Sequence, residues 1–301
     1  MNSPAFSRRR FTQFTAAASL ATLTSPLPAA APAQRWPIIG FSKPFQSLGP
    51  EQTADTVAEI GWDGIECPVR AKGQVLPERV EEDLPKLVEA LRKRGKVIGI
   101  ITTDVLNPSQ PTTRKVLQTA AKLGIKRYRM AYWKYAKDQS IPPQLDKIRG
   151  ELRDLAALNK ELGLQSGYQN HSGADYVGAP IWDIWSLVRD LDPKRVGICF
   201  DIGHATLEGG HSWPTEARLV EPHLTAVFVK DFAWKKGDKG WKAEWCPLGE
   251  GMVNRSFFAW LKKTSFNGPL SQHHEYDHGE GKPMIAKMQQ DLRVLREWLA
   301  A

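Results

Sequence analysis

The fold prediction rests on the stretch Val196-Gly-Ile-Cys-Phe-Asp201-Ile-Gly-His204. This apolar, strand-like run ends on a carboxylate, and an imidazole follows three residues later. A second stretch, Gly268-Pro-Leu-Ser-Gln-His273-His274-Glu275-Tyr276, ends in the same way. Strands that carry carboxylate and imidazole groups at their C-terminal ends predict a divalent metal site at the mouth of a barrel.

Short strand-like runs alternate with helical patterns along the chain. The runs are apolar or β-branched and are bounded by Gly, Pro, Asp or Asn. They are Ile38–Phe41, Gly64–Cys67, Val97–Thr103, Arg127–Ala131, Leu164–Gln169, Val196–Asp201, Leu224–Lys230 and Pro269–Glu275. Eight runs that alternate with helical segments predict an α/β fold, a single-domain (β/α)8 TIM barrel. An open doubly wound sheet is the alternative, and the absence of a Gly-rich phosphate motif after the first run counts against it.

The first 33 residues have the composition of a targeting segment. Ser7-Arg8-Arg9-Arg10-Phe11-Thr12 precedes a weakly apolar stretch, and Ala31-Pro32-Ala33 supplies small residues for cleavage. This order resembles a twin-arginine export signal and predicts a periplasmic or secreted protein. A disordered basic N-terminus is the alternative. The apolar stretch is too short and too broken to span a bilayer, so no membrane partner is expected after export.

Residues 34–301 remain as the folded part, and 268 residues suit one barrel of about 250 residues. The formal net charge of the whole chain is +8, but its basic residues are mixed with acidic ones. No basic face with interleaved aromatic residues is visible, so a nucleic-acid partner is not expected. Cys67, Cys199 and Cys246 have neither zinc-ribbon nor redox spacing.

Strand alternation predicts which polar side chains point into the barrel. If Asp201 and Glu275 point inward, then His273 does so as well, while His274 faces the helices. The inward set near the strand ends is Glu66, Gln169, His171, Asp201, His204, Lys230, His273 and Glu275. So many ionisable groups at one end of a barrel require a metal ion or internal pairing.

The connection from Asp231 to Val253 is long and contains Trp234, Trp241 and Trp245. A long loop in a compact domain is usually functional. Stacking of these indoles against a sugar ring is expected, with packing inside the loop as the alternative.

Several motifs, in order along the chain, resemble those of one family. They are Asp63-Gly-Ile-Glu66, Phe200-Asp201-Ile-Gly-His204, Val229-Lys230-Asp231, Pro247-Leu-Gly249-Glu250-Gly251 and the stretch from Gly268 to Tyr276. The chain resembles the xylose isomerase-like TIM barrels, which include sugar isomerases, sugar epimerases, inosose dehydratases and trinuclear-zinc AP endonucleases. The resemblance implies a divalent metal (Mn, Mg, Zn or Co) held by a carboxylate from strand five, Asp from strand six, His from strand seven and Glu from strand eight.

The chain departs from that pattern at Gln169, where the family has Glu, and at Phe228, where it has His. The predicted metal ligands are therefore Asp201, Glu275, His204 and His171. The predicted catalytic residues are Glu66, His171, Lys230 and Glu275. The predicted substrate contacts are Gln169, His204, His273, Trp234, Trp241 and Trp245.

Each of these residues also has a structural interpretation. Asp201 and Glu275 could be anchors paired to Lys230 or Arg129, and Glu66 could pair with Arg70. His204 could cap the loop that follows it, and His171 could be an ordinary loop histidine.

The resemblance predicts an exported, metal-dependent sugar isomerase or epimerase that removes a proton beside a carbonyl. Expulsion of a β-linked group would make it a lyase or dehydratase on keto-sugars or keto-glycosides. The alternative is a non-catalytic carbohydrate-binding barrel with a degenerate metal site, and a nuclease is the third possibility. The sequence leaves the oligomeric state open.

Overall fold

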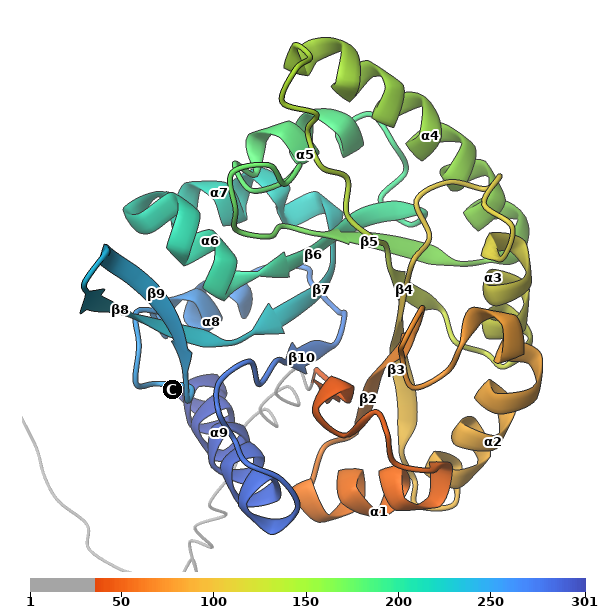
Figure 1. The fold of residues 1–301 in the computed structure, drawn as a ribbon, viewed down its shortest axis with the longest axis vertical. Helices are drawn as coiled ribbons and strands as arrows, with labels where there is room; N and C mark the ends of the chain where they lie inside the picture. Colours follow the sequence, from red (N-terminus) through yellow and green to blue (C-terminus); the bar gives the residue numbers. More distant parts are fainter. Residues whose placement is uncertain (1–35) are drawn as a thin grey trace, which may run out of the picture. The chain divides into compact units, whose positions relative to one another are not determined.

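Eight parallel strands close into a barrel in the computed structural model, which describes residues 36–301 (Figure 1). The strands are β1 (Ile38–Phe41), β2 (Gly64–Val69), β3 (Val97–Thr103), β4 (Arg127–Arg129), β5 (Gln165–Gln169), β6 (Val196–Asp201), β7 (Leu224–Val229) and β10 (Leu270–Gln272). Their order around the barrel is β1-β10-β7-β6-β5-β4-β3-β2. The predicted TIM barrel is therefore confirmed, and the open sheet is excluded.

Nine helices of the described chain cover the outside of the barrel (Figure 1). They are α1 (Pro50–Ile60), α2 (Val80–Arg92), α3 (Thr113–Lys122), α4 (Ile141–Leu162), α5 (Trp182–Val188), α6 (Ile202–Gly209), α7 (Trp213–Val220), α8 (Ser256–Leu261) and α9 (Lys282–Ala300). Short 3-10 turns lie at Lys43–Phe45, Pro77–Arg79, Gly210–Ser212 and Glu221–His223. None of the helices in residues 36–301 has the length and apolarity needed to cross a membrane.

Helix α4 illustrates how the pattern in the sequence produces the outer layer. Its residues Ile148, Leu152 and Leu155 are buried, because positions three and four apart lie on one helix face. Prolines occupy its first turn, where their missing N–H groups cost nothing. The helix ends at Leu162 and is capped by Gly163, whose positive φ of 69° favours glycine.

The apolar core has two parts, one inside the barrel and one between strands and helices. The inner part consists of Ile39, Ile100, Cys199, Ala226 and Phe228. These side chains come from β1, β3, β6 and β7, so they meet in the barrel interior. This small apolar layer is the floor beneath the polar side chains at the strand ends.

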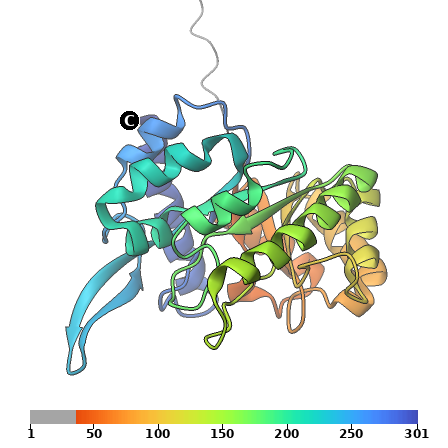
Figure 2. The same ribbon diagram turned by 90° about the horizontal axis from the view of Figure 1, so that it is seen from above.

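The connection after β7 differs from the loop that the sequence predicted. Residues 231–246 form an antiparallel hairpin of β8 (Asp231–Gly237) and β9 (Gly240–Cys246), which is a sheet of its own. The period-two alternation of its aromatic residues is a strand signal, and Asp238 and Lys239 supply a two-residue turn. The hairpin extends away from the barrel and its helices (Figure 2).

Residues 36–301 form one compact unit, and the division of the chain after residue 33 stays a prediction. The predicted export signal, residues 1–33, lies outside the described residues.

We expect Gly40→Ala in β1 to destabilise the barrel. A Cβ atom there would lie 2.2 Å from the Cη2 atom of Trp62, whose indole is fully buried and donates a hydrogen bond of 2.9 Å to Gln272. Forcing the indole aside should lower the free energy of unfolding by about 1–3 kcal/mol in urea titrations. Gly150→Ala in α4 is the matched control, since its Cβ would meet nothing within 4 Å. That control should be neutral or stabilise by about 0.5–1 kcal/mol; equal effects of the two substitutions would contradict the argument.

Candidate active site

A buried lysine lies at the centre of the predicted site. Lys230 directly follows β7 and is only 3% exposed. Its Nζ atom lies 2.7 Å from Nε2 of His204, 3.1 Å from Oε1 of Glu275 and 3.2 Å from Oδ2 of Asp201. The indole of Trp245 covers it, with 4.3 Å between Nζ and the ring centroid. Two carboxylates, an imidazole and an aromatic face therefore surround one ammonium group.

Asp201 joins the end of β6 to the start of α6. Its Oδ1 atom accepts a hydrogen bond of 3.0 Å from the backbone N–H of His204, as an N-cap does. Its Oδ2 atom accepts from the amide of Gln169 at 2.7 Å as well as facing Lys230. Burial opposes ionisation, but the positive charge of Lys230 outweighs it and holds the pKa of Asp201 below its ordinary value.

Glu275 is the carboxylate of this group that reaches solvent, with 29% of its side chain exposed. Although burial works in the opposite direction, the ammonium of Lys230 holds the pKa of Glu275 well below its ordinary value. Glu275 also lines a pocket of about 300 Å³, beside Phe41 and Tyr276. It is therefore an ionised group that a small molecule can approach.

Glu66 on β2 lies deeper than Glu275 and is fully buried. It accepts hydrogen bonds from Ser271 at 2.7 Å and Thr102 at 2.5 Å, and Nε2 of His273 lies 2.9 Å from its Oε2 atom. Arg129 lies 3.6 Å away, so the cationic partner is not the alternative, Arg70. Burial would raise the pKa of Glu66, but His273 and Arg129 outweigh it and lower the pKa to about 2.

His273 connects Glu66 to Glu275. Its Nδ1 atom lies 3.9 Å from Oε1 of Glu275, and its ring stacks against Phe228 and Phe41 with centroid distances of 4.5 and 4.9 Å. Burial lowers the pKa of His273, but the neighbouring Glu66 carboxylate raises it more, so the net shift is upward. The predicted inward direction of His273 is confirmed, and His274 faces the helix layer, 3.3 Å from Asp291 on α9.

Gln169 at the end of β5 bridges two polar groups of the site. Its side-chain oxygen accepts from Arg129 and from the hydroxyl of Tyr132, and its nitrogen donates to Asp201. Sequence reasoning did not place Arg129 and Tyr132 among the functional residues. Alternation could have found Arg129, because Tyr128, its neighbour on β4, bonds Asn159 in the helix layer and so points outward.

His171 lies in a cluster of rings at the rim. Its ring centroid is 4.0 Å from that of His204, 4.5 Å from Tyr176 and 5.0 Å from Tyr132. Its Nδ1 atom lies 2.9 Å from the carbonyl oxygen of Ser172, which can only accept, so Nδ1 carries the proton. Burial lowers the pKa of His171, so its ring is neutral at pH 7 and its Nε2 atom has a free lone pair.

His204 is also neutral, because burial holds its pKa well below the ordinary value. Its Nδ1 atom contacts Ser172 at 2.8 Å, and Trp245 meets its ring edge-on at 5.1 Å.

Trp234 and Trp241 lie farther out on the hairpin and are 44% and 67% exposed. The structure thus brings together all the predicted site residues except Trp234 and Trp241.

The predicted metal ligands do not form a metal site in this arrangement. Within residues 36–301, no group of three or more His, Cys, Asp or Glu side chains is arranged to hold a metal ion. The ammonium of Lys230 lies between Asp201, His204 and Glu275, and the oxygen of Gln169 faces a guanidinium. These residues do not fit a divalent cation as they stand, and the pairing of Asp201 and Glu275 with Lys230 is the structural alternative that the sequence left open.

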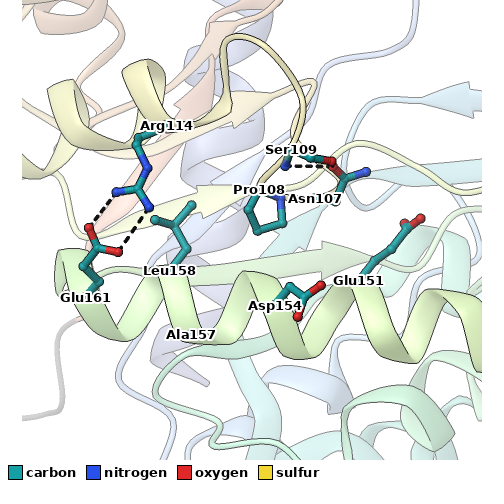
Figure 3. A pocket seen from close by; sticks show the side chains of 9 residues that line it. All are labelled: Asn107, Pro108, Ser109, Arg114, Glu151, Asp154, Ala157, Leu158 and Glu161. Atoms are coloured by element: carbon teal, nitrogen blue, oxygen red, sulfur yellow. Dashed lines mark hydrogen bonds and ion pairs between the residues drawn. The ribbon is translucent and has the colours of Figure 1, made fainter.

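A second hollow, of about 450 Å³, is made by other residues (Figure 3). It lies between the Asn107–Ser109 segment before α3 and a face of α4 that carries Glu151, Asp154 and Glu161. Glu161 is paired with Arg114 at 2.6 Å, and Glu151 accepts a hydrogen bond from Trp133. None of the residues around Lys230 lines it.

The chain belongs to the xylose isomerase-like TIM barrel family, whose model matches residues 54–298. It is also similar to the uncharacterised protein MJ1311 of Methanocaldococcus jannaschii, with 26% identity over 129 residues. That match covers 42% of this chain and 42% of the relative, so the chain spans less than half of the length of this relative.

Solved structures agree with this assignment at the level of the fold. One is a xylose isomerase-like TIM barrel protein from Mycobacterium smegmatis in complex with magnesium, with 17% identity, a TM-score of 0.66 and coverage of 89% of this chain and 99% of that one. Another is 3-keto-D-glucoside 4-epimerase from E. coli, with 14% identity, a TM-score of 0.67 and coverage of 87% and 100%.

Acid should weaken the fold through Glu66. Its pKa of about 2 in the folded chain lies below the ordinary value of 4.5, so its stabilising contribution is present above about pH 4.5 and is lost as the pH falls toward 2. Glu66→Gln should lower the free energy of unfolding at pH 7 by an amount on the order of 2–3 kcal/mol, and the difference from wild type should shrink toward pH 3. Urea titrations at several pH values measure this. Glu280→Gln, at an exposed position, is the control; a constant difference across the pH range would contradict the assignment.

Proposed function

We propose that this chain is a sugar isomerase- or epimerase-type enzyme that removes a proton beside the carbonyl of a keto-sugar or keto-glycoside. The observation that carries the proposal is the pair of groups at the barrel rim, a neutral His171 with a free Nε2 lone pair and an ionised, partly exposed Glu275. Such a pair, at the end of the barrel where TIM-barrel enzymes have their active sites, suits proton transfer. Membership of the family supports the class of reaction.

His171 is the better base of the two. A general base works best when its pKa lies near the working pH, and the pKa of Glu275 is held far lower by Lys230. Glu66 is excluded as a base, because it is fully buried and its oxygens are held by Ser271, Thr102 and His273. Glu275 then accepts a hydrogen bond from a substrate hydroxyl and so fixes the orientation of the sugar.

The fate of the proton decides the product. His171 takes the proton from the carbon beside the carbonyl, and the electron pair moves onto the carbonyl oxygen to give an enediol or enediolate. Protonation of the same carbon from the opposite face, by water or another acid, epimerises the sugar. Protonation of the former carbonyl carbon, with loss of the proton of the neighbouring hydroxyl so that it becomes the new carbonyl, isomerises it. If the pair instead expels a β-linked group as an alcohol, the reaction is an elimination.

The hairpin favours a substrate larger than one sugar ring. Paired residues of β8 and β9 share a face, and so do alternate residues along each strand, which places Trp245, Trp234 and Trp241 on one face. Phe232 links the first two, with ring centroids 6.1 Å from Trp245 and 5.9 Å from Trp234. This aromatic face begins at the site and continues to exposed indoles. Apolar faces of sugars stack on such surfaces, so a keto-glycoside with a second group on the hairpin is the preferred substrate.

A carbohydrate-binding barrel without activity is the second candidate, and Gln169 and Phe228 favour it. It predicts that keto-glycosides quench tryptophan fluorescence while no carbon-bound hydrogen exchanges with D2O.

We also propose export through residues 1–33, supported by the adjacent arginines. Cell fractionation tests this, and retention of an Arg8→Lys/Arg9→Lys variant in the cytoplasm is the expected result.

His171→Gln should lower kcat by about 100- to 10,000-fold with little change in KM, because it removes the base but leaves the binding surface. Deuterium incorporation from D2O into a panel of 3-keto-glycosides, followed by NMR, gives the rate. His211→Gln, at an exposed position on a 3-10 turn, is the control and should behave as wild type. Exchange at the wild-type rate in His171→Gln would remove His171 from the mechanism.

Trp234→Ala and Trp241→Ala should each raise KM for keto-glycosides by about 3- to 10-fold, the loss expected for one stacking contact of 0.5–1.5 kcal/mol. The kcat values, and the KM for a free keto-monosaccharide, should not change. Trp182→Ala removes an indole that is 53% exposed on α5, away from the hairpin, and serves as the control. Equal losses on both kinds of substrate would argue against a binding face along the hairpin.

A further inference from the structure

We propose that the ammonium of Lys230 is the resident cation of this site and takes the place of a divalent metal. The carboxylates and the imidazole that meet at the rim are then organised around a covalently attached charge. The consequence is a site that binds no divalent metal and keeps its arrangement in the presence of a chelator. Measurements of turnover test this inference only if the proposed function is right, whereas measurements of metal binding test it independently of the proposed function.

The geometry around Nζ is the first argument. Three side chains from separate elements each place one atom 2.7–3.2 Å from Nζ of Lys230. They are Asp201 at the end of β6, His204 in the first turn of α6 and Glu275 after β10. Two carboxylates and an imidazole from separate elements are a donor set that also suits a metal ion. The distances are those of hydrogen bonds and ion pairs to an ammonium group, and they exceed the roughly 2.0–2.6 Å of metal–ligand bonds. The donor set is thus complete with the ammonium as its centre.

The second argument is the distribution of charge. The carboxylates are Glu66, Asp201 and Glu275, and the permanent cations that face them are Lys230 and Arg129. A divalent ion among these donors would lie close to both cations, and repulsion between like charges in a buried site is large. Two of the three negative charges that a metal ion could use are therefore already paired with permanent cations.

The two departures from the family pattern point the same way. Gln169 offers a neutral amide, with its nitrogen toward Asp201 and its oxygen toward Arg129. Phe228 offers no ligand atom and stacks on His273. An amide that donates to Asp201 complements the lysine, since both bring hydrogen-bond donors to the same carboxylate oxygen.

Lys230 is a positioning residue, because it is only 3% exposed and its ammonium contacts Trp245 and Glu275. It fixes the Glu275 carboxylate at 3.1 Å and the His204 ring at 2.7 Å. Its positive charge also stabilises negative charge that develops on a substrate oxygen at the rim, as preorganised cations do.

The decisive experiment measures metal content of the purified chain after equilibration with Mn²⁺, Mg²⁺, Zn²⁺ or Co²⁺ and gel filtration. The expected wild-type result is well under one ion per chain for each metal, with the same Tm in metal and in EDTA. Lys230→Ala combined with Gln169→Glu removes the ammonium and adds a carboxylate, so this variant should gain about one ion per chain and a metal-dependent rise in Tm. Lys262→Ala, at an exposed position after α8, is the control and should resemble wild type.

A wild-type chain that retains one equivalent of metal, and loses it on Asp201→Asn, would overturn the proposal whatever the variants do. Turnover of a keto-glycoside at an unchanged rate in EDTA supports both the proposal and the proposed function. If the chain binds no metal and turns over no keto-sugar, the inference about Lys230 stands and the proposed enzymatic function is wrong. If the chain binds metal tightly and turns over a keto-sugar, the inference about Lys230 is wrong and the proposed enzymatic function stands.

Discussion

The attraction between one buried ammonium and two carboxylates organises the functional end of this barrel. Asp201 and Glu275 are 74 positions apart in the sequence, yet both contact Nζ of Lys230. Charges that are taken out of water are stable only if they are paired and hydrogen-bonded. Gln169, His204 and Trp245 therefore have their places around this group because each completes the surroundings of one of its members.

A second polar layer supports the first. Glu66, held by Ser271 and Thr102, fixes one nitrogen of His273, and the other nitrogen of His273 faces Glu275. The apolar side chains inside the barrel lie below this layer and exclude water from it. The base of the rim is thus buried and hydrogen-bonded, whereas His171, Glu275 and Trp245 are partly exposed at its edge.

Sequence reasoning was strongest where local patterns determine the result. Alternation of strands and helices predicted the barrel, and period two predicted that His273 points inward and His274 outward. It was weaker for the surroundings of the inward groups, because a list of inward side chains does not say which are neighbours. The carboxylates suggested a metal ion, but in the structure they are paired with Lys230. That pairing depends on the order of the strands around the barrel. The hairpin was missed because its length suggested a loop, although its aromatic alternation was visible.

The hairpin has a further consequence, for the behaviour of the protein in concentrated solution. It is a sheet of two strands, and within residues 36–301 no further strand pairs with the outer edges of β8 and β9. Such edges invite pairing with another chain, and lysines on an edge oppose it by repulsion and by the cost of dehydrating them. Lys235, Lys236, Lys239 and Lys242 are all exposed along this arm. The hairpin thus presents its indoles to solvent, and the dehydration of its basic side chains, two of which are paired with Glu244, opposes pairing of its edges with another chain.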